Sequence, residues 1–491
     1  MKDGLIDMSD NKIRRVTGGL VWTYAERLLA QIISIVVTIV LARVIAPNEY
    51  GIISIVNIFI NIANAFVING FGNSLIQKKE ADSLDFSTVF FFSLAFSSVI
   101  YLIIFLCSGI IADFYQMSEL QLIIRIMAIR LPIAAINSVQ QAYISKKMEF
   151  RKFFFSTLGG TLTSAVIGIV MAYSGFGIWA LVAQDLSNVC IDTAVLCFTS
   201  GWTLQIKYSR TRMKSLFSYG WKIMLVGVMT TLYSNLRNLI IGKKYTSSDL
   251  AFSEKGEQFP SAIAGNINTS ITKVLFPVLS DAQNDSEQLK RMVRRSIKIG
   301  SYILFPILFG FAMIAQSFVS VLLTEKWIGC VPFLQIMCIV YALQPLQTSS
   351  LQCIKALGRS GLYLLIDIAK KIVGIIILLG TVMLFNNVII IVFGALITEI
   401  ISIIILFPVN KKLIGYSYLE QLKDIAPTMA LTIIMCTLVK MVSIFVPVNG
   451  IIQLVLEIIV GIISYIILSV MMKNENFAYI LKIGKDILCR R

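Results

Sequence analysis

Ten basic residues lie inside long apolar segments of this chain, where a charged side chain is costly. On insertion scales a Lys or Arg at the centre of a membrane-spanning helix costs roughly 2.5–3.5 kcal/mol. Such groups must therefore reach the lipid headgroups or face protein, water or an anion. Arginine suits an anionic diphosphate, because its planar guanidinium keeps its charge and donates two parallel hydrogen bonds. The ten are Arg27, Arg125, Arg130, Lys222, Arg237, Lys255, Lys273, Lys370, Lys371 and Lys440.

Polar side chains accompany several of these cations at three- and four-residue steps, which places them on one face of a helix. Such stripes predict either the walls of a water-filled cavity or hydrogen bonds between neighbouring helices. The stripes are Thr23, Arg27, Gln31, Ser34 and Thr38; Ser54, Asn57, Asn61 and Asn64; Arg130, Asn137 and Gln141; and Thr230, Ser234, Arg237 and Asn238.

We expect the deep cations and part of these stripes to bind a polar, anionic substrate. Arg27, Arg130 and Arg237 should line one positive, water-accessible space between two helical bundles. The expected substrate-binding residues are Arg27, Arg125, Arg130, Arg237, Lys255, Gln31, Asn57 and Asn61.

Acidic residues in the apolar segments are sparser. Glu26 and Asp185 have no obvious cation on the same helix, which is the setting of a coupling-ion site for H⁺ or Na⁺. A partner on a neighbouring helix is the alternative for Asp185. Asp367 has the spacing to pair with Lys370 and Lys371 along one helix, so that this trio is either a local salt bridge or a substrate contact.

Fourteen apolar segments of roughly 20–25 residues, the length that crosses a bilayer core, carry these side chains. Alternate gaps and both termini hold most of the 43 Lys and Arg. Because basic loops stay in the cytoplasm, we expect an all-α polytopic membrane protein with both termini cytoplasmic. The predicted segments are 17–42, 51–76, 86–111, 119–144, 153–174, 177–200, 216–242, 249–276, 296–323, 330–354, 361–385, 387–409, 424–446 and 450–472.

The composition excludes several classes of function. The chain is 57% hydrophobic and 14% charged, and its gaps are too short for a soluble catalytic domain. Histidine is absent, which removes the commonest general base and metal ligand. The net charge of +16 resides largely in short loops, where topology and anionic lipids account for it. We therefore expect membrane lipids but no nucleic acid as partners, no metal, no catalytic residues, and no cofactor beyond a coupling ion.

A faint internal repeat relates two parts of the chain at an offset of 200 residues. Leu41-Ala42-Arg43 recurs as Ile241-Gly242-Lys243, and Glu49-Tyr50-Gly51 as Asp249-Leu250-Ala251. Six predicted helices separate the copies, so the halves share one orientation and a substrate site is expected between them. The predicted domains are a six-helix bundle over 1–204, a second over 205–412, a helix pair over 413–473 and a basic amphipathic helix on the inner membrane surface over 474–491.

Two stretches carry a family resemblance. The first comprises Leu41-Ala42-Arg43, Pro47, Glu49-Tyr50-Gly51 and Gly70-Phe71-Gly72-Asn73-Ser74-Leu75-Ile76-Gln77-Lys78-Lys79. The second runs from Ile241-Gly242-Lys243 to Leu275-Phe276-Pro277. Both resemble bacterial polysaccharide-biosynthesis exporters, the Wzx-like flippases of the multidrug/oligosaccharidyl-lipid/polysaccharide exporter superfamily.

This resemblance implies two pseudo-symmetric six-helix bundles plus a terminal helix pair. It also implies translocation of an undecaprenyl-diphosphate-linked oligosaccharide across the bacterial cytoplasmic membrane by alternating access, for the assembly of cell-surface polysaccharide. Other polysaccharide-assembly proteins are further partners that it implies. The stretch Phe252-Ser253-Glu254-Lys255 departs from the Tyr-Asn-Arg pattern of the family, so the resemblance does not itself assign a ligand role to Lys255.

Two other functions are alternatives. A cation-coupled multidrug exporter of the same superfamily would share the helix count, but its cavity should be acidic and aromatic rather than rich in arginine. A membrane glycan polymerase or ligase needs an extracytoplasmic loop with catalytic residues, for which the outer gaps are too short. We therefore expect a transporter and not an enzyme.

Overall fold

The computed structural model describes residues 22, 26, 28–446 and 450–489, so Arg27 lies outside the described residues. Within these ranges the chain is helical and contains no strand. It divides into two compact units with the boundary between Ala251 and Phe252, and each unit is described by itself. The predicted all-α class is confirmed.

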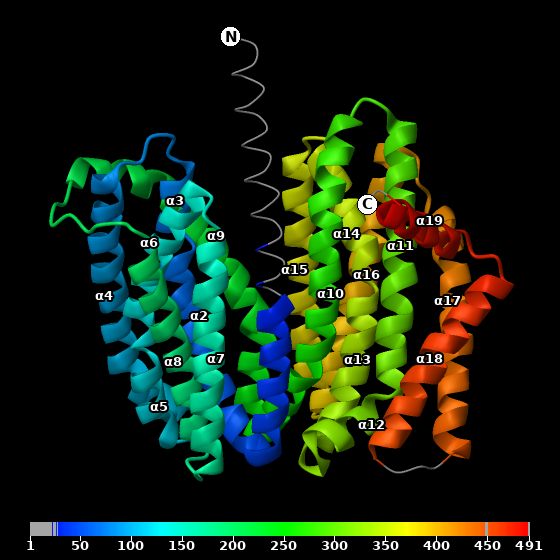
Figure 1. The fold of residues 1–491 in the computed structure, drawn as a ribbon, viewed down its shortest axis with the longest axis horizontal. Coiled ribbons are helices and arrows are strands. Elements are labelled where there is room, and N and C mark those ends of the chain that lie inside the picture. The colour runs from blue at the N-terminus through cyan, green and yellow to red at the C-terminus, as the bar shows by residue number, and fades with distance from the viewer. Residues whose placement is uncertain (1–21, 23–25, 27, 447–449, 490–491) are drawn as a thin grey trace. The chain divides into compact units, whose positions relative to one another are not determined.

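The first unit consists of eight labelled helices and one shorter helix, Leu28–Val44, that precedes them (Figure 1). The labelled helices are α2 (Pro47–Ile68), α3 (Phe71–Gln77), α4 (Ser83–Tyr115), α5 (Glu119–Met127), α6 (Arg130–Lys147), α7 (Arg151–Tyr173), α8 (Ile178–Thr199) and α9 (Arg210–Lys244).

The second unit begins within α10 (Ser247–Asp281) and ends with α19 (Glu475–Cys489). Between them lie α11 (Ser286–Met313), α12 (Ala315–Phe318), η1 (Val319–Leu323), η2 (Glu325–Cys330), α13 (Val331–Ala342), α14 (Gln344–Ala356), α15 (Ser360–Leu384), α16 (Val388–Ile414), α17 (Tyr418–Phe445) and α18 (Ile451–Met471).

Each predicted apolar segment coincides with a helix or with consecutive helices, although the first begins outside the described residues. In the described part of the chain, 10 helices or runs of consecutive helices are long and apolar enough to cross a membrane. Leu28–Val44 is a shorter apolar helix, and α9, α10 and α15 contain more polar or charged side chains. Two of the predicted site residues, Arg237 on α9 and Lys255 on α10, are among the residues that lower the apolarity of these helices.

Two predicted segments are interrupted near their middle. Segment 119–144 consists of α5 and α6, and segment 330–354 of α13 and α14. A proline follows each break, Pro132 in α6 and Pro345 in α14. Proline donates no hydrogen bond and its ring clashes with the carbonyl four residues earlier, which interrupts the helical hydrogen bonding. The first break places Arg130 at the start of a new helix.

Helix α7 packs against α8 along a row of small residues. The row comprises Ser156, Gly160, Ser164, Gly168 and Ala172, all buried and four residues apart. A Cβ atom on Gly160 would lie 3.0 Å from the carbonyl oxygen of Asn188, and one on Gly168 would lie 3.0 Å from the Cβ of Gln184. Small residues at this spacing let two membrane helices approach backbone to backbone.

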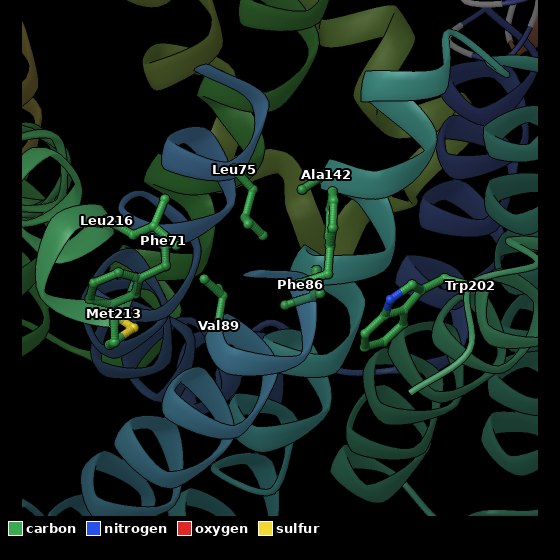
Figure 2. Close-up of a cluster of buried hydrophobic side chains, with 9 residues drawn as sticks. Phe71, Leu75, Phe86, Val89, Ala142, Trp202, Met213 and Leu216 are labelled. Carbon is green, nitrogen blue, oxygen red and sulfur yellow. The ribbon is translucent and has the colours of Figure 1, made fainter. Parts of the chain in front are cut away.

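A hydrophobic cluster joins α3, α4, α6 and α9 with the segment after α8 (Figure 2). Phe71 lies at one side of it, and Trp202 at the other side packs against Phe86 with ring centroids 6.4 Å apart. The buried members are Phe71, Leu75, Phe86, Val89, Val139, Ala142, Trp202, Met213 and Leu216. This cluster fixes the helix ends near one another and so positions α6.

In the second unit, ion pairs and an aromatic cluster join α11 to α17 and α18. Arg294 pairs with Asp424 through Nε and Oδ2 at 2.7 Å. The predicted amphipathic helix over 474–491 corresponds to α19, whose residues Phe477 and Ile480 pack against a cluster on α11, α17 and α18. The buried members of that cluster are Tyr302, Leu431, Met435 and Tyr465.

The predicted domain boundary after residue 204 follows the internal repeat and stays a prediction. The contacts between helices divide the chain at a different place, between Ala251 and Phe252. This division places α9 with the first unit, where α9 packs against α2, α3 and α4.

Candidate functional site in the first unit

A polar cavity of about 210 Å³ lies inside the first unit, between α2, α6 and α8. The predicted stripe of Arg130, Asn137 and Gln141 on α6 contributes three of its lining residues, which confirms that these side chains share one face. The other lining residues are Asn64, Ile68, Ala134, Ser138, Asn188, Val189 and Asp192.

The charged part of the site is a pair between α6 and α8. Nη1 of Arg130 donates to both carboxylate oxygens of Asp185, at 3.0 Å to Oδ1 and 2.7 Å to Oδ2. The two side chains are 23% and 30% exposed. Asp185 therefore has a cation on the neighbouring helix, which is the alternative that the sequence left open for it.

Amides continue the contact between α6 and α8 along the cavity wall. Gln141 donates through Nε2 to Oδ1 of Asn137 at 2.6 Å. Asn137 in turn donates through Nδ2 to Oδ2 of Asp192 at 2.8 Å and to Oγ1 of Thr193 at 3.0 Å. The α6 stripe thus lines a cavity and also holds two helices together, so both interpretations of its pattern apply.

Three polar atoms of the lining are buried and have no hydrogen-bond partner among the described residues. They are Oδ1 of Asn64, Nε of Arg130 and Oδ1 of Asp192. Buried polar atoms are nearly always paired with protein or with water, so we expect ordered water or a small side-chain shift beside the cavity to supply the partners of these three.

The partners on α8 follow from the sequence spacing of that helix. Asp185, Asn188 and Asp192 are separated by three and four residues and so share one face. Asn188 also donates through Nδ2 to Oγ of Ser164 on α7 at 3.3 Å, which the small residues of α7 permit. Asp185 thus pairs with Arg130, and Asp192 lies two turns further along the same face of α8.

Two further predicted residues of the first unit bond to other helices. Nε of Arg125 on α5 donates to Oγ of Ser108 on α4 at 2.9 Å, and its guanidinium lies 4.6 Å from the centroid of the Phe105 ring. Arg125 does not line the cavity. Glu26 accepts a hydrogen bond from Oγ1 of Thr157 on α7 at 2.9 Å.

The remaining predicted residues of this unit do not line the cavity either. Gln31 is half-buried in the helix Leu28–Val44, Asn57 is half-buried on α2, and Asn61 is exposed on α2. Arg237 is half-buried on α9, which packs against α2. A common space lined by Arg27, Arg130 and Arg237 stays a prediction, since Arg27 lies outside the described residues.

Lys255 belongs to the second unit, where Nζ donates to Oε1 of Gln258 at 3.1 Å. Of the three charged residues on α15 for which the sequence predicts a local salt bridge or a substrate contact, two form a salt bridge. Lys371 pairs with Asp367 at 2.9 Å, whereas Lys370 donates to Oε1 of Gln347 on α14.

Asn64, Asn188 and Asp192 line the cavity but were not among the predicted site residues. Asn64 continues the Asn57–Asn61 spacing of α2, and Asn188 and Asp192 continue the spacing of Asp185 on α8. That periodicity was the available signal. Whether the stripes of α2 and α8 face α6 depends on how the helices pack, which the spacing within one helix does not show.

Comparison with known proteins identifies the family. Residues 40–332, more than half of the chain, match the model of a family described as polysaccharide biosynthesis protein. The chain belongs to this polysaccharide biosynthesis protein family. The predicted resemblance is thereby confirmed at the level of the family.

Similar sequences come from Bacillus subtilis and Escherichia coli. The chain is 23% identical over 355 residues to the teichuronic acid biosynthesis protein TuaB of Bacillus subtilis, covering 71% of this chain and 73% of that protein. It is 23% identical over 333 residues to the lipopolysaccharide biosynthesis protein WzxC of Escherichia coli, covering 66% and 67%.

Solved structures show the fold of this family member. The lipid II flippase MurJ in an inward closed conformation superimposes with a TM-score of 0.73 at 11% identity, covering 92% of this chain and 98% of MurJ. An inward-facing multidrug resistance MATE transporter superimposes with a TM-score of 0.64 at 14% identity, covering 80% and 98%. The polytopic membrane fold predicted from the sequence is confirmed.

Proposed function

We propose that this chain is a flippase that moves a lipid-linked oligosaccharide across the bacterial cytoplasmic membrane by alternating access, for the assembly of cell-surface polysaccharide. The family, the relatives named for polysaccharide biosynthesis and the MurJ-like fold support this function. The observation that carries it is the polar cavity inside an otherwise apolar helical unit.

The substrate is proposed to be a glycan on undecaprenyl diphosphate. Its sugar hydroxyls would meet the amides of Asn64, Asn137 and Gln141, which line one cavity. Its diphosphate would meet arginine, which binds phosphate oxygens through two parallel hydrogen bonds. Arg27, Arg125, Arg237, Lys255, Gln31, Asn57 and Asn61 stay predicted substrate contacts.

Arg130 reaches a diphosphate in this scheme by exchanging its partner. Its charge is balanced by Asp185 at 2.7 Å, so an anion competes with that carboxylate for the guanidinium. A proton on Asp185 removes the competing negative charge and frees Arg130. Proton binding and diphosphate binding therefore favour each other, and the coupling is reciprocal.

Asp185 is accordingly the proposed proton-coupling residue, with Glu26 as the second predicted one. Na⁺ is the alternative ion, and it would need several further oxygen ligands around the carboxylate. A pH gradient and a Na⁺ gradient applied separately to proteoliposomes distinguish the two ions.

The proposed location is the cytoplasmic membrane with both termini in the cytoplasm. Single cysteines placed at the two ends of a chain whose native cysteines are replaced test this orientation. Labelling of either end by a membrane-impermeant maleimide in intact cells would contradict it.

Export in the native host tests the function itself. Deleting the gene should abolish the surface polysaccharide and leave its lipid-linked precursor at the inner face of the membrane, and the wild-type gene should restore export. Purified protein should flip a fluorescent undecaprenyl-diphosphate oligosaccharide in proteoliposomes without forming or transferring a glycosidic bond. Bond formation without flipping would show a glycan polymerase or ligase instead.

A further inference from the structure

The second unit contains an apolar cavity of about 390 Å³ that none of the predicted site residues lines. Its walls come from α10, α11, α17 and α18, and nearly all of them are aliphatic or aromatic. Three isoleucines at its α18 side, Ile458, Ile462 and Ile466, are 40%, 56% and 46% exposed. In a bilayer these exposed apolar side chains face lipid, so the cavity is accessible to apolar molecules from the membrane.

One carboxyl group lies in this apolar wall. Glu457 on α18 lines the cavity and is only 1% exposed. Its Oε1 accepts hydrogen bonds from Oγ of Ser317 on α12 and from Nε2 of Gln453 on α18, both at 3.2 Å. Its Oε2 is buried and has no hydrogen-bond partner among the residues that the structure describes.

No described cation balances Glu457. The ion pairs of α11 and α17 are formed by other residues, chiefly Arg294 with Asp424 and Lys290 with Glu420. Lys440 on α17 is exposed and is not part of the cavity wall. The other titratable residue of the wall is Tyr465, whose hydroxyl donates to the carbonyl oxygen of Tyr302 at 2.9 Å.

An isolated carboxylate in apolar surroundings is so unfavourable that the group takes up a proton instead. The hydrogen bonds agree with that form, because two donors meet Oε1 and leave Oε2 to carry a hydrogen. A metal ion does not fit, since Na⁺, Mg²⁺ and Ca²⁺ need a shell of oxygen ligands. Only Glu457 and Tyr465 contribute polar side chains to this wall.

We propose that Glu457 is a proton-binding site of the α17–α18 helix pair, open to the apolar cavity. The ligand is a proton carried on Oε2, and no residue of the polar cavity in the first unit takes part. The inference goes beyond the proposed function and does not depend on which substrate is transported.

Carbodiimide labelling tests the site, because the apolar reagent dicyclohexylcarbodiimide reacts with protonated carboxyl groups. The carboxyl proton moves to a reagent nitrogen while a carboxyl oxygen bonds to the central carbon, and the adduct rearranges to a stable N-acylurea. The full chain in lipid nanodiscs is treated with this reagent and digested for mass spectrometry. Asp424 is the internal control, since its side chain is 5% exposed but pairs with Arg294 and Lys298.

We expect Glu457 to be labelled about tenfold or more above Asp424, because Asp424 pairs with two cations and Glu457 with none among the described residues. The site should be unlabelled in Glu457→Gln. Equal labelling of Glu457 and Asp424, or no labelling of Glu457, overturns the proposal.

Infrared difference spectroscopy supplies a readout that does not depend on access of a reagent. Wild type minus Glu457→Gln should show the carbonyl band of a protonated carboxylic acid, and the same variant should elute from size exclusion as the wild type does. A difference spectrum with a carboxylate band in its place also overturns the proposal.

Discussion

The guanidinium of Arg130 and the carboxylate of Asp185 face each other between α6 and α8, with Nη1 at 3.0 and 2.7 Å from the two oxygens. Both side chains keep part of their surface exposed, 23% for Arg130 and 30% for Asp185. Partly solvated ion pairs contribute little net free energy, typically about 0–1 kcal/mol. The pair can therefore open for an anion at small cost, which a fully buried pair does not allow.

Replacing Asp185 by Asn removes the proposed proton site and leaves the side-chain shape unchanged. We expect flipping per inserted molecule to fall about tenfold, which corresponds to about 1.4 kcal/mol of lost coupling. The stability should change by less than about 1 kcal/mol, because the pair is partly solvated. Flipping in proteoliposomes with and without a pH gradient measures the first effect, and thermal unfolding in detergent the second.

Asp113→Asn is the matched control, since Asp113 is an exposed acid near the end of α4. Flipping by Asp185→Asn that still rises with a pH gradient as in the wild type would remove Asp185 from the coupling mechanism.

Asn137→Ala should destabilise the first unit by about 1–3 kcal/mol, the cost of leaving buried polar groups without a partner. The change takes the donor from Asp192 at 2.8 Å and the acceptor from Gln141 at 2.6 Å. Asn61→Ala is the control, because Asn61 is an exposed asparagine on α2. Equal melting temperatures of the two variants would show that the Asn137 contacts do not stabilise the fold.

Gly160→Ala should destabilise the α7–α8 pair by about 1–3 kcal/mol, the usual cost of overpacking. The new Cβ would lie 3.0 Å from the Asn188 carbonyl oxygen and 3.2 Å from Cβ of Asp192. The neighbouring substitution Gly159→Ala meets only Cγ2 of Val195 at 3.8 Å and should be neutral or mildly stabilising. Thermal unfolding of both variants compares them, and a loss of stability in Gly159→Ala alone would contradict the packing described.

We expect acid to weaken the ion pair between Arg212, at the N-terminal end of α9, and Asp82, at the N-terminal end of α4. The hydrogen bond from Arg212 lowers the pKa of Asp82 from 3.8 to about 2. A carboxyl whose folded pKa is depressed contributes stability above its unfolded pKa, and this contribution is lost as the pH falls towards the folded value. We therefore expect the amides at the beginning of α9 to lose protection between pH 4 and pH 2, when exchange rates are corrected for the intrinsic rate at each pH.

Arg212→Gln serves as the control for this pH effect. It should already show faster exchange at pH 4 and little further change on acidification. A wild-type exchange rate at the start of α9 in this variant at pH 4 would show that the Asp82 contact does not hold the two helices together.

The sequence predicts which residues share a helix face, because that depends on the 3.6-residue period alone. Arg130, Asn137 and Gln141 were grouped in this way and do line one cavity. Arg125 was predicted with Arg130 as a substrate contact but not as part of this stripe; five residues separate the two, which corresponds to roughly 140° of helix rotation. The proline break between α5 and α6 separates the two further.

The contacts across helices were beyond the reach of periodicity. Asp185 pairs with Arg130, and Asp192 with Asn137, although 55 residues separate the members of each pair. Which face of α8 meets α6 is decided by the small residues of α7, a packing effect that no single-helix pattern contains. The same limit explains why the apolar cavity beside Glu457 was not foreseen.

The row of small residues on α7 also bears on movement. Helices α7 and α8 approach closely at Gly160 and Gly168 and have little side-chain volume between them there that could slide, so we expect them to tilt as one rigid pair. This pair carries Asp185, Asn188 and Asp192. Arg130, by contrast, is the first residue of α6, directly after the break that precedes Pro132. A rocking motion would thus change the distance between the rigid α7–α8 pair and α6, which follows a break in the helix. The polar cavity lies between α6 and α8.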